Sequence, residues 1–271
     1  MTKFSTVFAT ILTAGLLSGC ATAPSPSSPL YVLVHGAFQD ARAWNEILPL
    51  LRAKGVQAVA VNLPGRVNDG SALEAATLDG YRDAVLKVVN AQNGPVVLVG
   101  HSFGGITISN VAEAAPEKIR TLVYVAAYLP EVGAADQSMA KISEKDQWNK
   151  FNKARQNFIL AQDYKSATVL ADDQLLLFCA TCTPEAQRKT LAIMQREPLA
   201  PAATPVNVTA ARFGRVDKVY VHTTQDNAVS YTLQQQMVQR TPVRKTVTLA
   251  SGHSPFVEMP QGLADALISL P

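Results

Sequence analysis

The sequence predicts an α/β fold with a mostly parallel, six-stranded sheet and helices on both of its faces. Short β-rich segments alternate with helical segments along most of the chain, and one long segment interrupts this alternation. At 271 residues, with 48% hydrophobic and 17% charged residues, the chain is long enough for one large α/β domain with a sizeable buried core.

The expected elements are placed by their hydrophobic patterns. Apolar runs rich in Val, Ile and Leu predict strands, and apolar residues spaced three and four apart predict helices. The expected strands are residues 30–34, 56–61, 95–100, 120–126, 218–223 and 243–249. The expected helices are residues 42–54, 77–92, 103–115, 229–240 and 260–269.

Residues 128–213 interrupt the alternation. They contain amphipathic stretches at 145–160, 172–178 and 184–195. Because a bare loop of this length is uncommon inside a compact domain, we expect a helical cap inserted over the active site, with a core of residues 30–127 and 214–271. Phe38, Trp148 and Phe178 are candidates for a substrate pocket, although aromatic residues of this kind also pack a cap onto its core.

The first thirty residues differ in composition from the rest. Lys3 precedes a short apolar run at 7–17, and small residues stand directly before Cys20. This is typical of a bacterial lipoprotein signal at 1–19 with lipid on Cys20, and the run is too short for a stable transmembrane helix. A plain secretory signal is the alternative. The Pro- and Ser-rich residues 20–29 then form a tether.

We therefore expect an exported protein, either periplasmic or anchored to the outer membrane through its N-terminal lipid only. By resemblance to such lipoproteins, a residue other than Asp after the cysteine, here Ala21, suggests the outer membrane. Cys179 and Cys182 form a C-x-x-C pair, for which a local disulfide is the leading interpretation in an exported chain. Reduced structural thiols, a redox site and a metal site are the alternatives, and the sequence shows neither a thioredoxin-like unit nor a second ligand pair.

Partners other than a small molecule are not indicated. The net charge is only +3, and no basic run with interleaved aromatic residues suggests nucleic-acid binding. No Gly-x-Gly-x-x-Gly sequence follows the first strand, so a dinucleotide site is not predicted. No metal and no organic cofactor are implied.

The strongest motif is Gly-His-Ser-Phe-Gly at residues 100–104, between an expected strand and an expected helix. A serine on a sharp strand-to-helix turn needs glycines around it, because neighbouring backbone leaves no room for a Cβ. This context makes Ser102 a candidate nucleophile. The alternative is a glycine-rich turn in which the serine has no role.

A nucleophilic serine needs a base and a group that orients the base. His253 follows the expected last strand, and Asp226 follows the strand before it, so the order along the chain is Ser, Asp, His. Asp217 competes with Asp226 but lies at the amino end of its strand. Because catalytic groups of parallel sheets gather at the carboxyl ends of the strands, we favour Asp226.

A donor loop is expected after the first strand. His35 and Gly36 begin this loop, and the N–H groups of Ala37 and Phe103 are the candidates for stabilising an oxyanion. An ordinary strand-ending turn is the alternative for the His-Gly pair. His222, at a strand end, is expected to be a packed neighbour.

With these motifs placed, residues 30–270 resemble the α/β-hydrolase superfamily, in the branch of plant methyl esterases, hydroxynitrile lyases and small bacterial carboxylesterases. The resemblance is carried by residues 31–38 with Trp44, the Gly-His-Ser-Phe-Gly-Gly sequence at 100–105, residues 224–226 and the Gly-His pair at 252–253. Hydroxynitrile lyases of this branch typically have a threonine where this chain has Gly36 and a lysine where it has Ser254. They also tend to have Glu where this chain has His101.

The resemblance implies hydrolysis of small to medium carboxylic esters through an acyl-serine, with Ser102, Asp226 and His253 as the triad. Alternatives on the same scaffold are a hydroxynitrile lyase-like or a peroxide-dependent acyl activity, and a ligand-binding surface lipoprotein is the alternative from another class. An intact set of catalytic groups argues against binding alone, because the fold does not require those groups together.

Overall fold

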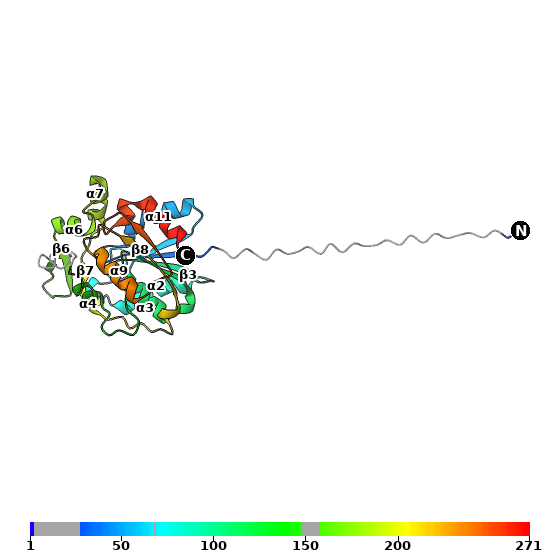
Figure 1. Cartoon of the computed structure of the whole chain (residues 1–271), viewed down its shortest axis with the longest axis horizontal. Coiled ribbons are helices and arrows are strands. Elements are labelled where there is room, and N and C mark those ends of the chain that lie inside the picture. Colours follow the sequence, from blue (N-terminus) through cyan, green and yellow to red (C-terminus); the bar gives the residue numbers. More distant parts are fainter. Residues whose placement is uncertain (3–27, 68, 148–157) are drawn as a thin grey trace.

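The computed structural model describes residues 1–2, 28–67, 69–147 and 158–271, and it confirms the six-stranded sheet. The strand order is β2-β1-β3-β4-β8-β9, and every neighbouring pair is parallel. The strands are β1 (Tyr31–Val34), β2 (Ala58–Val61), β3 (Val96–His101), β4 (Ile119–Val125), β8 (Asp217–Thr223) and β9 (Lys245–Leu249). Figure 1 shows the sheet at the centre of the domain.

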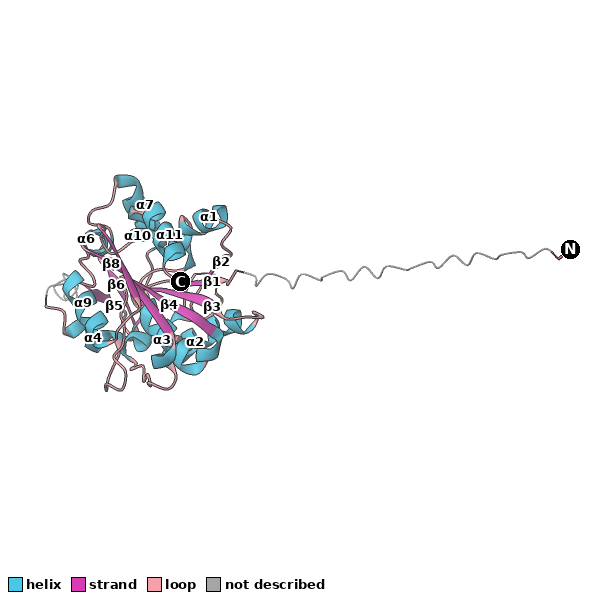
Figure 2. Ribbon diagram, turned by 45° about the vertical axis from the view of Figure 1, so that its right-hand side comes forward, coloured by secondary structure: helices cyan, strands magenta, loops and turns pink. Residues whose placement is uncertain are grey.

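Helices cover both faces of this sheet, as the sequence predicts (Figure 2). The helices of the core are α1 (Ile47–Ala53), α2 (Leu78–Asn90), α3 (Gly104–Ala114), α9 (Tyr231–Arg240), α10 (Pro255–Glu258) and α11 (Pro260–Ser269). Short 3₁₀ helices accompany them in the described part of the chain: η1 (Ala41–Trp44), η2 (Leu73–Ala75), η3 (Pro116–Lys118) and η5 (Phe213–Arg215).

Alternate residues of β1, β2, β3, β4 and β8 supply two separate cores. Val32 packs in the cluster that contains apolar residues of α2, α3 and α9, whereas its neighbour Leu33 packs in the cluster that contains residues of α1 and α11. Successive side chains of a strand point to opposite faces, so a strand buried on both sides must be apolar at every position. The wholly buried β1 and residues 96–99 of β3 meet this condition.

The helix expected at 42–54 is divided in the structure into η1 and α1. Pro49 gives a physical reason for the start of α1 at Ile47. Proline has no N–H to donate, so it is tolerated in the first turn of a helix but not in the interior. The sequence therefore contained the signal for this division.

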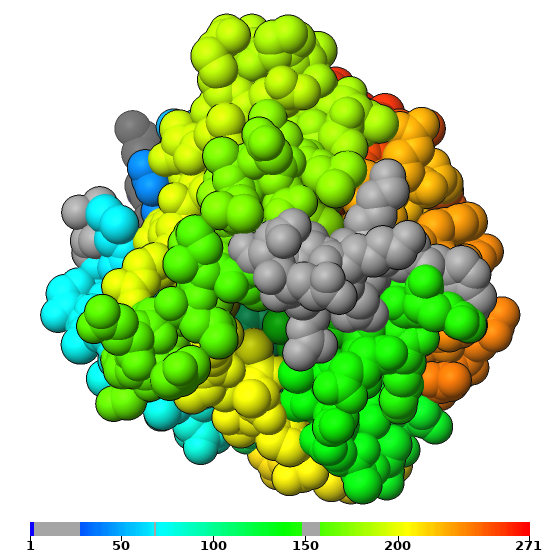
Figure 3. Space-filling model, turned by 90° about the vertical axis from the view of Figure 1, so that its left-hand side faces the viewer, coloured from blue at the N-terminus to red at the C-terminus, as the bar shows by residue number. Residues whose placement is uncertain are grey.

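The segment expected to be a helical cap contains a small sheet as well as helices. Residues 128–213 contain α4 (Met139–Glu144), α6 (Ala171–Phe178), α7 (Pro184–Ile193) and α8 (Leu199–Ala203). They also contain an antiparallel sheet of β5 (Phe158–Leu160), β6 (Ser166–Val169) and β7 (Glu197–Pro198). These strands have only three, four and two residues and no regular alternation of burial, so they do not stand out in a sequence. Figure 3 shows green to yellow atoms of this segment covering most of one face of the molecule.

The N-terminal predictions are not addressed by this fold. The signal at 1–19, Cys20 and most of the tether lie outside the described residues, as does Trp148 in the cap. Among the helices that the structure describes, none has the length and apolar character needed to cross a membrane.

Helix α3 packs so closely on the chain after β4 that Gly105 is required. A Cβ built on Gly105 would lie 2.2 Å from the carbonyl oxygen of Tyr128. We expect Gly105→Ala to destabilise the protein by about 3 kcal/mol or more, because backbone must move to admit the methyl group. Urea unfolding measures this change.

Gly94→Ala is the matched control, since a Cβ at Gly94 meets nothing within 4 Å. This variant should stay within about 1 kcal/mol of the parent. Equal stabilities for the two variants would contradict the close packing.

Candidate active site

Ser102 lies on the sharp turn between β3 and α3. Its φ of 53° is in the left-handed region, which a residue with a side chain adopts only where the surroundings impose it. The Ser102 N–H donates to the carbonyl of Val125 at 3.2 Å, and the Ser102 carbonyl accepts from Gly105 and Tyr128. Backbone contacts from two neighbouring segments therefore hold the serine in this conformation.

The first loop of the core passes directly over this turn. A Cβ built on Gly36 would lie 2.8 Å from the Cβ of Ser102 and equally close to Nδ1 of His101. Any larger residue at Gly36 would push the loop away from the serine. On the other side of the turn, a Cβ on Gly100 would lie 2.7 Å from the carbonyl oxygen of Gly104.

Asp226 is a buried carboxylate with a full set of donors. It lies after β8, and the residue is only 7% exposed. One oxygen accepts from the backbone N–H groups of Ala228 and Val229, both at 2.8 Å. The other accepts from Thr223 Oγ1, Gln234 Nε2 and His253 Nδ1. Such donors stabilise a charged carboxylate away from water.

Gln234 of α9 was not predicted from the sequence, yet it is central to this arrangement. Its Oε1 accepts from the N–H of Thr223, and its Nε2 donates to the Thr223 carbonyl and to Asp226. These contacts fix which way the amide points, so Nε2 must face the carboxylate. The only sequence signal was a Gln at this position of the helix predicted at 229–240.

His253 lies in the loop after β9 and is 1% exposed. Its Nδ1 lies 2.9 Å from Oδ2 of Asp226. A carboxylate can only accept, so Nδ1 carries the proton and the Nε2 of the neutral ring has a lone pair available for a proton. The structure therefore brings the predicted Asp226 and His253 together in the geometry that orients a general base.

His101 joins the serine turn to the His253 loop. Its Nε2 donates to the carbonyl of His253 at 2.8 Å, and the two rings lie 4.7 Å apart between centroids. Burial lowers the pKa of His101 well below its ordinary value, and the neighbouring His253 lowers it further. His101 is thus a neutral, positioned neighbour of the site.

The donor loop after β1 is held by His35. Its Nε2 accepts from the N–H of Leu63 at 3.2 Å, so Nδ1 carries the proton and donates to the Gly36 carbonyl at 2.8 Å. Burial lowers the pKa of His35 to about 3, and the positive charge of Arg66 acts in the same direction. A neutral His35 therefore fixes the start of this loop.

The two predicted oxyanion donors are available. Ala37 lies in the loop beside the serine turn, and Phe103 directly follows Ser102. Among the hydrogen bonds of the described residues, neither the Ala37 N–H nor the Phe103 N–H donates to a protein acceptor. Buried N–H groups are nearly always paired, so two unused donors beside a serine are consistent with a ligand-facing role.

Aromatic side chains of the cap approach the histidine. Phe178 lies 5.7 Å from the His253 ring and 6.0 Å from the Phe38 ring, measured between centroids. Beyond Phe38 is a cavity of about 460 Å³. Its lining is mostly apolar and includes Phe38, Met139, Phe158, Leu160, Leu199 and Ala202. The predicted residues Phe38 and Phe178 thus lie between this cavity and His253.

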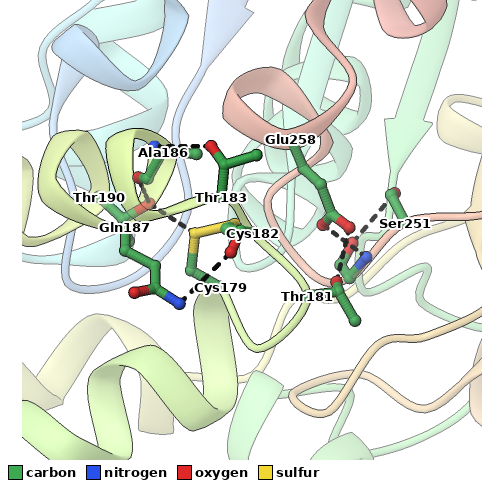
Figure 4. Close-up of a disulfide and its surroundings, with 10 residues drawn as sticks. Cys179, Thr181, Cys182, Thr183, Ala186, Gln187, Thr190, Ser251 and Glu258 are labelled. Carbon is green, nitrogen blue, oxygen red and sulfur yellow. Dashed lines mark hydrogen bonds between the residues drawn. A yellow bond between two sulfur atoms is a disulfide. The ribbon is translucent and has the colours of Figure 1, made fainter.

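The C-x-x-C pair is a disulfide, and the turn that it closes contacts the His253 loop (Figure 4). Within this turn, Thr181 Oγ1 donates to Oε1 of Glu258 at 2.6 Å. The other oxygen of Glu258 accepts from the N–H of Gly252 at 2.8 Å, directly before His253. Glu258, which sequence reasoning missed, therefore connects the cap to the loop that carries the base.

The competing acid lies elsewhere. Asp217 begins β8 at the opposite end of the sheet, where it accepts from Thr121 Oγ1 and pairs with Arg244 at 3.0 Å. His222 packs between Tyr220 and Tyr231, with its Nδ1 3.3 Å from Gln234 Oε1. Within residues 28–67, 69–147 and 158–271, no cluster of three or more His, Cys, Asp or Glu side chains could hold a metal ion.

A parallel sheet of this order, with a serine on the turn after its third strand in sequence and an Asp–His pair after its last two, defines the α/β-hydrolase fold. The sequence comparison agrees with this class. The model of the alpha/beta hydrolase family matches residues 31–266, and the chain belongs to this family.

Relatives are found in plants and bacteria. The chain is 29% identical over 248 residues to putative methylesterase 11, chloroplastic, of Arabidopsis thaliana, covering 89% of this chain and 63% of that protein. It is 25% identical over 243 residues to the pyrethroid hydrolase of Sphingobium wenxiniae, covering 87% of this chain and 85% of that protein. The crystal structure of a pyrethroid hydrolase from Sphingobium faniae matches with a TM-score of 0.77 at 24% identity, over 89% of this chain and 96% of that one.

The buried, neutral histidines predict a loss of stability in acid. In the unfolded chain His35 and His101 take up a proton near pH 6.5, whereas in the folded protein their lowered pKa values keep them neutral. Below that pH the unfolded state binds more protons, so the free energy of unfolding should fall by up to about 1.4 kcal/mol per pH unit for each histidine. Urea unfolding between about pH 7.5 and about pH 5 measures this slope.

His101→Gln separates this contribution from that of the carboxylates. Gln keeps a donor for the His253 carbonyl but does not titrate, so its slope should be shallower by about 1.4 kcal/mol per pH unit. Parallel slopes for the parent and the variant would contradict the assignment.

Proposed function

We propose that this protein is a carboxylesterase that cleaves small to medium esters through an acyl-serine intermediate. Ser102 is the nucleophile, His253 the general base and acid, and Asp226 the group that orients the histidine. The observation that carries the proposal is the strained Ser102 turn, connected through the adjacent His101 to the buried His253–Asp226 pair. The named esterase and hydrolase relatives support the same reaction class.

In the proposed mechanism His253 Nε2 removes the proton of the Ser102 hydroxyl as Oγ attacks the ester carbonyl. The N–H groups of Ala37 and Phe103 stabilise the oxyanion of the tetrahedral intermediate. Asp226 accepts from Nδ1 and stabilises the imidazolium that forms. His253 then protonates the departing alcohol and activates the water that releases the acid.

The apolar cavity beyond Phe38 supports an ester whose acyl or alcohol group is small to medium and apolar. With Phe178 beside both His253 and Phe38, an apolar group can extend from the serine toward this space. The relatives named for methyl and pyrethroid substrates are consistent with this size range. The lyase alternative is not favoured, because Gly36 and Ser254 replace its usual residues.

We also propose that the chain is exported and lipid-anchored through Cys20, with residues 128–213 acting as a cap on the core of 30–127 and 214–271. Support comes from the N-terminal sequence and from the Cys179–Cys182 disulfide, which suits an oxidising compartment. Globomycin-sensitive processing and palmitate labelling that depends on Cys20 would test the anchor.

Ser102→Ala tests the nucleophile. Hydrolysis of a p-nitrophenyl ester series should fall by about four orders of magnitude or more, because the acyl-enzyme cannot form. Ser109→Ala is the matched control: this buried hydroxyl further along α3 donates to the Gly105 carbonyl and should leave kcat nearly unchanged. Equal background rates for the parent and Ser102→Ala would contradict the esterase proposal.

The paired variants Asp226→Asn and Asp217→Asn test the acid. Asp226→Asn should lower kcat by about a thousandfold to ten-thousandfold, since an amide can hold His253 in the wrong tautomer. Asp217→Asn, at the other end of the sheet, should change kcat by no more than a few-fold. A reversed order of effects in steady-state kinetics would assign the role to Asp217.

A further inference from the structure

A segment of the cap holds the backbone of the donor loop at Phe38. The Phe38 N–H donates to Oε2 of Glu197 at 2.5 Å, and the Phe38 carbonyl accepts from the N–H of Gln195 at 2.8 Å. Phe38 directly follows Ala37, whose N–H is an expected oxyanion donor. The N–H and the carbonyl of Phe38 are therefore both bound by residues almost 160 positions later in the chain.

These two hydrogen bonds are needed because Phe38 has a φ of 60°. A left-handed conformation costs a residue with a side chain about 1–2 kcal/mol, and a bulky aromatic residue adopts it only where partners impose it. Without the two hydrogen bonds, the loop would relax toward ordinary φ values. Such a rotation would also turn the planar peptide between Ala37 and Phe38. The N–H of Ala37, which lies next to this peptide, would then be displaced.

Glu197 can serve as this acceptor because Arg66 neutralises it. Arg66 Nη2 lies 2.7 Å from Oε2 of Glu197, and the two side chains are 0% and 2% exposed. Arg66 is itself held by Tyr81 Oη and by the carbonyl of Arg196, both at 3.1 Å. A buried carboxylate without such a partner is strongly destabilising, and an N–H donating to a paired carboxylate makes a strong, short hydrogen bond.

Further contacts join the same two segments. Gln195 Nε2 donates to the carboxylate of Asp40, and Gln195 Oε1 accepts from the N–H of Val67 at 3.1 Å. Segment 195–197 is thus bound to the donor loop at Phe38 and Asp40, and to the neighbouring loop at Val67. None of these residues touches Ser102 or His253 in a described contact. Because Glu197 also lines the apolar cavity, an effect through the loop must be separated from an effect on substrate binding.

We propose that Glu197, held by Arg66, is a positioning residue that sets the oxyanion donor of Ala37 by fixing the backbone of Phe38. This inference rests on the proposed esterase function. Its consequence is that the oxyanion site is complete only when the cap segment 195–197 is seated on the donor loop. Loss of the contact should lower kcat and leave KM nearly unchanged, because the oxyanion exists only near the transition state.

Two double variants test the proposal. R66L/E197Q and R66L/E197L both remove the buried charges together, which avoids a stranded ion. Gln keeps an acceptor for the Phe38 N–H, whereas Leu has none. Relative to the Gln pair, the Leu pair should lose about tenfold to a hundredfold in kcat with KM within about threefold, since losing an oxyanion donor outright costs about a hundredfold to a thousandfold.

The affinity for a transition-state mimic distinguishes a misplaced oxyanion donor from general destabilisation of the protein. Affinity for a trifluoromethyl ketone, which forms a tetrahedral oxyanion on the serine, should fall in the same ratio as kcat. Inhibition by the product carboxylic acid should stay within about threefold. Rates are expressed per active serine, titrated with an organophosphonate, so that unfolded protein does not contribute.

Lys218→Met is the matched control for loss of a buried cation. Lys218 Nζ donates to the carbonyls of Phe213 and Val216 at the amino end of β8, so this variant should lower Tm without changing kcat per active serine. If the Leu pair does not fold, R66L/E197Q compared with the parent provides the test: its weaker neutral acceptor should lower kcat several-fold at unchanged KM.

Equal kcat values for the Leu and Gln pairs, or parallel losses in kcat and product affinity, would overturn the positioning role. Where only the Gln pair folds, a kcat equal to that of the parent would overturn it. Parent protein that is no more active than Ser102→Ala would instead overturn the esterase function, and this inference with it.

Discussion

The site depends on a close approach of backbones around Ser102. The residue is held at a φ of 53° between β3 and α3. The loop at Gly36 passes on one side, and on the other side the chain after β4 packs against Gly105 of α3. Cβ atoms at either glycine would lie within 2.8 Å of neighbouring atoms. The sheet, the helix and two loops can therefore meet at the serine only with glycine at these positions, and the strained turn is maintained by that packing.

Buried polar groups then set the direction of each reactive atom. Asp226 receives donors from two backbone amides, Thr223 and Gln234, which leaves one defined place for His253 Nδ1. The cap adds two connections of its own, Glu258 to the His253 loop and Glu197 to the donor loop. Interior hydrogen bonds of this kind are costly to leave half made, so they specify one arrangement of the site.

Much of the fold was predictable because local signals agree with the tertiary structure. All six strands of the main sheet lie within two residues of their expected ends, since strands buried on both faces must be apolar throughout. Ser102, Asp226 and His253 were predictable because each follows an expected strand, and the carboxyl ends of parallel strands are where catalytic groups gather.

The remaining features depend on distant partners that no local pattern reveals. The strands β5, β6 and β7 are too short to show an alternating pattern in the sequence, so this segment was expected to be a helical cap. Gln234, Glu258 and Glu197 read as ordinary polar residues in the sequence. Their importance follows from contacts with residues 11, 6 and 159 positions away, which only the folded chain establishes.

The central claim is that Ser102 forms a covalent intermediate with its substrate. The most direct measurement is mass spectrometry of the protein after brief exposure to a p-nitrophenyl phosphonate, followed by peptide mapping of the modified site. The account predicts one adduct per chain, located on Ser102, formed together with an equal amount of p-nitrophenol. No adduct, or an adduct on another residue, would contradict it.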